Sequence, residues 1–134
     1  MNKNIEVIAA GIIINENKDK VLLIQRKDKL WGLTWSIPGG HVEFNEKIID
    51  SLKRELVEEL SLNIVDSEFL SYEEIMHNDR HLISFNFFVF AKENFTFNEE
   101  IETAKWFKFS ELYNIDHKIP EEGMNKINLW SQKK

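Results

Sequence analysis

The sequence contains no cysteine among its 134 residues. Disulfide bonds and thiolate-ligated metal sites are therefore excluded. A chain without cysteine fits a reducing compartment, and we expect a cytoplasmic protein. The sequence also has no apolar run near the roughly 20 residues that cross a bilayer, so no membrane association is expected. The apolar stretch 5–14 is interrupted by Glu6 and predicts a buried strand rather than a signal peptide.

Positive charge is also scarce, with 17 Lys and Arg against 23 Asp and Glu and a formal net charge of −6. Nonspecific nucleic-acid binding relies on a basic surface, so no stable nucleic-acid partner is expected. A net acidic protein that handles phosphates needs metal ions to bridge the two negative partners. The length predicts one domain over 1–134, and a homodimer stays open.

The most informative segment covers residues 40–62, where four glutamates and one arginine stand at fixed spacing. If residues 46–60 are helical, Glu55, Glu58 and Glu59 share one helix face. Three crowded carboxylates repel one another, and a bound divalent cation relieves that repulsion. An acidic helix face alone usually indicates only a solvated surface. The other residues of the segment are therefore needed to indicate a metal site.

Segment 40–62 resembles the signature of the Nudix hydrolases. In that signature a glycine, five residues, Glu, seven residues, Arg-Glu, an aliphatic residue, any residue, Glu-Glu, any residue, glycine and an aliphatic residue follow in order. The chain matches every specified position except the last glycine, where it has Ser61. A glycine just past a helix end usually adopts a left-handed conformation. Serine there would cost about 1 kcal/mol if that conformation is kept, and Asn63 is the alternative residue for it.

The resemblance implies the Nudix fold, an α/β/α sandwich with a mixed β-sheet and a loop-helix-loop catalytic box. Strands on both sides of one long helix agree with that α/β class. We expect strands over 5–14, 21–25, 35–37, 67–76, 81–91 and 104–109. We expect helices over 46–60, with Asn45 as N-cap, over 110–113 and over 120–130. The remaining expectations are loops over 26–33 and 92–103, a turn over 77–80 and a break at 38–40.

The resemblance also implies a Mg²⁺ site, with Mn²⁺ as a substitute. Carried onto matching positions, it makes Glu58 and Glu59 the main ligands and Glu55 a ligand or general base. The carbonyl of Gly39 is implied as a further ligand. Glu46 and Arg54 would brace the site, because an arginine beside glutamates keeps some of them ionised and fixes their rotamers.

Further candidates lie outside the box. Among the acids of 99–102 we take Glu100 as an additional metal ligand, the alternative being an ordinary acidic loop. Arg26 closes the second strand and could bind phosphate, or it could be a solvated strand end. Trp31 and Trp35 could stack on a base, although core packing is the alternative for both.

Segments 36–43 and 104–107 look most like mutator-type members of the family, which act on nucleoside triphosphates. The implied function is Mg²⁺-dependent hydrolysis of a nucleoside triphosphate to a nucleoside monophosphate and pyrophosphate. The alternatives are hydrolysis of a nucleotide sugar or ADP-ribose, and a non-catalytic nucleotide-binding module. In each case the expected partner is a small-molecule nucleotide.

Overall fold

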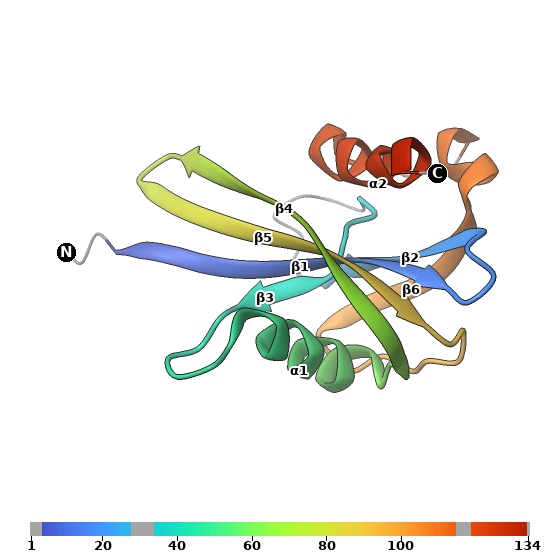
Figure 1. Ribbon diagram of the computed structural model, residues 1–134, viewed down its shortest axis with the longest axis horizontal. Helices are drawn as coiled ribbons and strands as arrows, with labels where there is room; N and C mark the ends of the chain where they lie inside the picture. Colours follow the sequence, from blue (N-terminus) through green and yellow to red (C-terminus); the bar gives the residue numbers. More distant parts are fainter. Residues whose placement is uncertain (1–3, 28–33, 115–118, 134) are drawn as a thin grey trace.

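The computed structural model describes residues 4–27, 34–114 and 119–133. A six-stranded mixed sheet lies between two helices, so the expected α/β/α sandwich is confirmed (Figure 1). The strands are β1 Ile5–Asn15, β2 Lys20–Arg26, β3 Gly39–His41, β4 Ile64–His77, β5 Arg80–Ala91 and β6 Ile101–Lys108. The helices are α1 Ile48–Leu60, the 3-10 helix η2 Phe109–Asn114 and α2 Glu121–Lys133.

Strand β1 organises the sheet, whose main order is β4-β5-β1-β2-β6. It pairs in parallel with β5 along its whole length. On its other side it forks, because its first half pairs antiparallel with β3 and its last residues pair antiparallel with β2. The segment that leads into α1 therefore starts from the middle of the sheet.

Alternating side chains of the strands build two cores. On one face, α1 buries Leu52, Leu56 and Leu60 against the sheet. On the other face, α2 buries Ile127 and Trp130. In Figure 1 α1 lies below the sheet and α2 above it. The two helices therefore cover opposite faces of the sheet.

The start of α1 differs from the prediction. Asn45 is not the N-cap, because it has a positive φ of 69° two residues before the cap position at Lys47. Glu46 consequently lies outside the helix, and Asp50 is the acid in the first turn. The Glu46 carboxylate instead accepts a hydrogen bond of 3.2 Å from the backbone N–H of Glu43. Helix α1 therefore begins at Ile48 instead of residue 46, because the Glu46 side chain bonds the loop backbone.

The predicted break at 38–40 is correct only for Pro38, because Gly39 and Gly40 belong to strand β3. A Cβ atom on Gly39 would lie 2.3 Å from the carbonyl oxygen of Ala9, so only glycine permits this pairing. Residues 35–37 form no strand but one antiparallel bridge from Ser36 to Ile24. Strand β6 begins three residues earlier than expected.

The end of α1 has the left-handed residue that a glycine usually supplies, although the residue is Ser61. Ser61 has φ 48° and ψ 38°, and its N–H bonds the carbonyl of Val57 at 2.9 Å. Asn63 does not take this role, since its φ is not positive. The serine keeps the conformation at a cost of about 1 kcal/mol.

For Trp31 and Trp35 the sequence predicts either stacking on a base or packing in the core. Trp35 belongs to the core, where its ring meets Phe107 edge-on with centroids 4.9 Å apart. Trp31 and the 28–33 part of the expected loop lie outside the described residues. Core packing is thus the outcome for Trp35, and stacking on a base is wrong for this residue.

Candidate active site

A cavity of about 710 Å³ brings together several residues predicted from the sequence. This volume falls in the range of about 300–1,000 Å³ that is usual for small-molecule sites. Its wall includes Arg26, Gly39, Glu55, Glu59 and Glu100. Three predicted site residues, Glu46, Arg54 and Glu58, do not line it.

The helix α1 presents Glu55 and Glu59 to the cavity one turn apart. Its apolar side packs on the sheet, so these two carboxylates face strand β3. A Cβ atom on Gly40 would lie 2.7 Å from Cδ of Glu55. The glycine therefore leaves the space into which the Glu55 carboxylate fits.

Arg26 forms an ion pair with Glu59 inside this cavity. Its Nη1 lies 2.8 Å from Oε2 of Glu59, and its Nη2 donates to the carbonyl oxygen of Gly39 at 3.0 Å. The Glu59 side chain is only 2% exposed. A carboxylate buried this far requires a charged partner, which Arg26 supplies. No local sequence pattern predicts this pairing, because the two residues are 33 positions apart.

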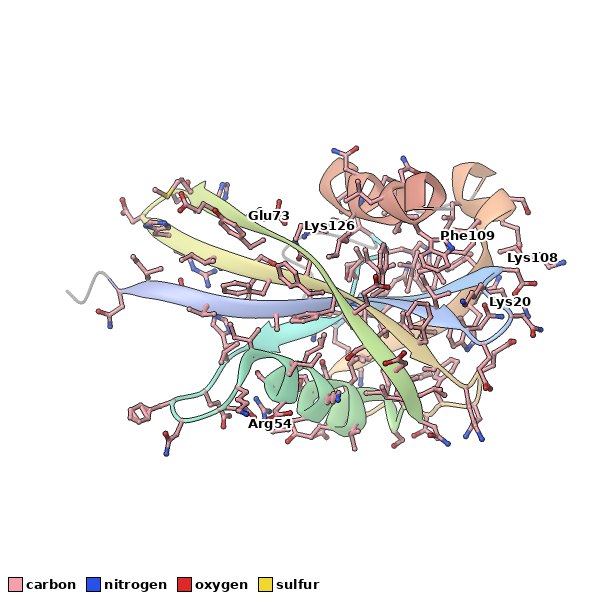
Figure 2. All side chains as sticks on the ribbon, viewed as in Figure 1. Lys20, Arg54, Glu73, Lys108, Phe109 and Lys126 are labelled. Atoms are coloured by element: carbon pink, nitrogen blue, oxygen red, sulfur yellow. The ribbon has the colours of Figure 1, made fainter. Side chains whose placement is uncertain are left out.

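Arg54, labelled beside helix α1 in Figure 2, forms hydrogen bonds with several acids of segment 40–62. Its Nε lies 2.7 Å from Oε2 of Glu46 and its Nη2 lies 3.1 Å from Oε1, which is a bidentate pair. Its Nη1 contacts Glu55 at 3.1 Å and Glu58 at 3.3 Å. Arg54 thus fixes the orientation of three carboxylates from outside the cavity. Glu58 is 58% exposed on the solvent side of this arginine.

The Glu55 carboxylate is in a different environment from the other box acids. Desolvation by burial, followed by the negative charge of Glu59, raises the pKa of Glu55 above its ordinary value. The hydrogen bond from Arg54 opposes this shift. A carboxylate whose pKa is raised towards neutral pH is better suited to accept a proton from water.

The Glu46–Arg54 pair predicts a specific acid sensitivity. The hydrogen bond from Arg54 lowers the pKa of Glu46 to about 2. A lowered pKa stabilises the fold above the unfolded value of 4.5, and this contribution is lost as the pH falls towards 2. We expect Glu46→Gln to melt below the wild type at pH 6, with the difference disappearing near pH 2. The measurement is the thermal midpoint against pH, with exposed Glu16→Gln as control. A difference that stayed constant between pH 6 and pH 2 would contradict this.

The chemistry of the cavity wall suits a hard divalent cation. Within the described residues, no three His, Asp or Glu side chains already converge to hold a metal ion. Four residues of the wall, Gly39, Glu55, Glu59 and Glu100, nevertheless offer oxygen donors. Oxygen donors with net negative charge are those that Mg²⁺ prefers. A guanidinium group already contacts two of them, which shows that this position favours positive charge.

The sequence did not predict three polar residues in or beside this cavity. Lys126 and Ser84 line the cavity, and Glu73 forms an ion pair with Lys126. Glu73 and Ser84 are cross-strand partners in β4 and β5, whereas Lys126 comes from α2 much further along the chain. No motif or spacing links Lys126 to the other two, so only the folded chain reveals this group.

Comparisons with known proteins identify the fold and the family. A MutT structure described for Aliivibrio salmonicida and Vibrio cholerae is 23% identical, with a TM-score of 0.80, and the match covers 98% of this chain and 100% of that chain. The 8-oxo-dGTP diphosphatase of Buchnera aphidicola subsp. Schizaphis graminum is 44% identical over 62 residues, which is 46% of this chain and 47% of that protein. The m7GpppN-mRNA hydrolase NUDT17 of Danio rerio is 36% identical over 66 residues, 48% of this chain and 22% of that protein.

The chain spans less than half of the length of both curated relatives. No helix in the described part of the chain is long and apolar enough to cross a membrane. The family model described as NUDIX domain matches residues 6–126, which is most of the sequence. On this match, with the shared fold in agreement, the chain belongs to the NUDIX domain family.

Proposed function

We propose that this chain is a metal-dependent pyrophosphohydrolase that converts nucleoside triphosphates to nucleoside monophosphates and pyrophosphate. The single observation that carries the proposal is that Glu55, Glu59, Glu100 and Gly39 share one cavity wall with Arg26. The cavity is large enough for a nucleotide. The named relatives include a diphosphatase of a nucleoside triphosphate, which supports this substrate class.

The residues divide into ligands and groups that position them. Gly39, Glu55, Glu59 and Glu100, which line the cavity, would hold Mg²⁺, or Mn²⁺ in its place. Glu58 would join these ligands only by turning away from Arg54. When bound, such an ion neutralises phosphate charge and lowers the pKa of a coordinated water. Arg54 and Glu46 keep the box carboxylates in fixed orientations from behind.

Two side chains would act on the substrate itself. Arg26 lies at the cavity wall with a planar set of donors that suits phosphate oxygens. Glu55, whose pKa is raised, would accept a proton as water attacks phosphorus. The new bond joins the water oxygen to the α-phosphorus. The bond from this phosphorus to the oxygen that bridges the α- and β-phosphates breaks, and that oxygen leaves as part of pyrophosphate.

The wider assignments are also proposals. We propose that residues 1–134 act as a single Nudix domain on a small-molecule nucleotide. The net charge of −6 argues against nucleic acid as a partner. The lack of cysteine supports a cytoplasmic location. A homodimer stays a prediction.

The test is turnover of a panel of nucleoside triphosphates, nucleotide sugars and ADP-ribose, first with Mg²⁺ and then with Mn²⁺. We expect pyrophosphate from triphosphates with either ion, and loss of turnover when EDTA removes the metal. Turnover confined to nucleotide sugars or ADP-ribose would replace the substrate class. Binding of nucleotides without turnover under either metal would instead indicate a non-catalytic binding module.

A further inference from the structure

The cavity has a second part on the α2 side of the sheet, whereas Glu55 and Glu59 belong to helix α1 on the other side. Its wall here comes from α2, β1, β4, β5 and the segment just before β3, and it is mostly apolar. Its residues include Ile8, Ile37, Ile75, Leu82, Ser84 and Lys126. Apolar walls with few polar groups are typical of sites that bind a planar ring.

Lys126 supplies the positive charge in this second part. Its Nζ lies 2.6 Å from Oε1 of Glu73, and the lysine side chain is only 17% exposed. Figure 2 shows the two side chains approaching each other between α2 and β4. An ammonium group has three donors, and in the described part of the chain Glu73 is its one recorded partner. Donors therefore remain for a ligand in the cavity.

Ser84 supplies an acceptor in the same part of the wall. Its side chain is 1% exposed, and its hydroxyl donates to Oδ1 of Asn86 at 2.9 Å. A hydroxyl has one hydrogen, so the lone pairs of Ser84 can only accept a bond from a ligand. The second part of the cavity thus presents a charged donor and a neutral acceptor between apolar walls.

Resting on the proposed function, we propose that Lys126 is a specificity-determining residue that selects bases with a ring carbonyl beside a ring N–H. Guanine, hypoxanthine, uracil and thymine have this pair, with the carbonyl accepting from Lys126 and the N–H donating to Ser84. Adenine and cytosine have an amino group there, which places a donor against the ammonium. Glu73 is a positioning residue, because it holds Lys126 without lining the cavity.

The experiment compares kcat/KM for two matched pairs, ITP with ATP and UTP with CTP, which differ only in this edge of the base. The wild type should favour ITP and UTP by about tenfold. Lys126→Met should bring both ratios close to one by lowering turnover of the carbonyl-bearing member. Lys126→Arg should keep the preference, and Glu73→Gln should reduce it. The control is Lys108→Met, an exposed lysine of β6 that should change neither ratio.

Equal kcat/KM within each pair for the wild type would overturn the inference and leave the proposed function intact. A ratio that survives in Lys126→Met would do the same. No turnover of any of the four nucleotides by the wild type would remove the proposed function, and this inference with it. Circular dichroism shows whether each variant folds. If Lys126→Met does not fold, the ratios of Glu73→Gln decide, and unchanged ratios there count against the inference.

Discussion

Glu59→Gln is expected to lower kcat/KM on the best nucleoside triphosphate by about a thousandfold. Glutamine has the same size but lacks the charge, so the cavity loses its most buried carboxylate. Metal ions contribute several kcal/mol to transition states of this kind, and each 1.36 kcal/mol corresponds to about tenfold in rate. The measurement is pyrophosphate release with saturating Mg²⁺.

The matched control for this variant is Glu16→Gln, an exposed change in the turn between β1 and β2. It removes one negative charge far from the cavity, so its kcat/KM should equal that of the wild type. Activity of Glu59→Gln within about tenfold of the wild type would mean that Glu59 serves only to pair with Arg26. Thermal melts separate this result from simple unfolding.

Gly39→Ala should both destabilise the fold and lower the activity. The added Cβ would meet the carbonyl oxygen of Ala9 at 2.3 Å and Cα of Ala10 at 2.9 Å. Both contacts are with the backbone of β1, which cannot move without disturbing the sheet. We expect a loss of about 1–3 kcal/mol in the free energy of unfolding, measured by urea denaturation. The carbonyl of Gly39 would shift as well, so kcat/KM should fall beyond the effect on folding.

Gly123→Ala is the matched control for Gly39→Ala, because an added Cβ at Gly123 is not expected to destabilise the fold. A Cβ there would meet only side-chain atoms, with Cγ2 of Ile119 at 3.3 Å. In helix α2, alanine is favoured over glycine by roughly 0.5–1 kcal/mol. Gly123→Ala should therefore be neutral or more stable than the wild type. Equal stability losses at Gly39 and Gly123 would show that the backbone clash at β3 is not the cause.

The sequence predicted the elements of the fold well where hydrophobic periodicity was strong. Strands β1, β2 and β5 and helix α1 appeared within a few residues of their bounds. The errors fell where backbone geometry or local polar bonds decide the structure. Gly39 pairs as a strand because it lacks a Cβ, and Glu46 bonds the loop instead of entering the helix.

Motif spacing predicted the candidate residues on α1 and the contact of Arg54 with the neighbouring glutamates, but not the ion pair of Arg26 with Glu59. Glu55 and Glu59 face the cavity as the helical spacing requires, whereas Glu58 lies on the exposed side of Arg54. Residues brought together by packing of a helix on the sheet, such as Arg26 of β2 with Glu59 of α1 and Lys126 of α2 with Glu73 of β4, share no local signal. Predicting such a pair needs the position of the helix over the strands.

The most direct test of the central proposal is Mn²⁺ binding measured by electron paramagnetic resonance in the wild type, Glu59→Gln and Glu16→Gln. If the carboxylates of this cavity hold the cation, Glu59→Gln should bind Mn²⁺ at least about tenfold more weakly than the other two proteins. Equal Mn²⁺ affinity in all three proteins would contradict the account, because the cation would then lie somewhere other than beside Glu59.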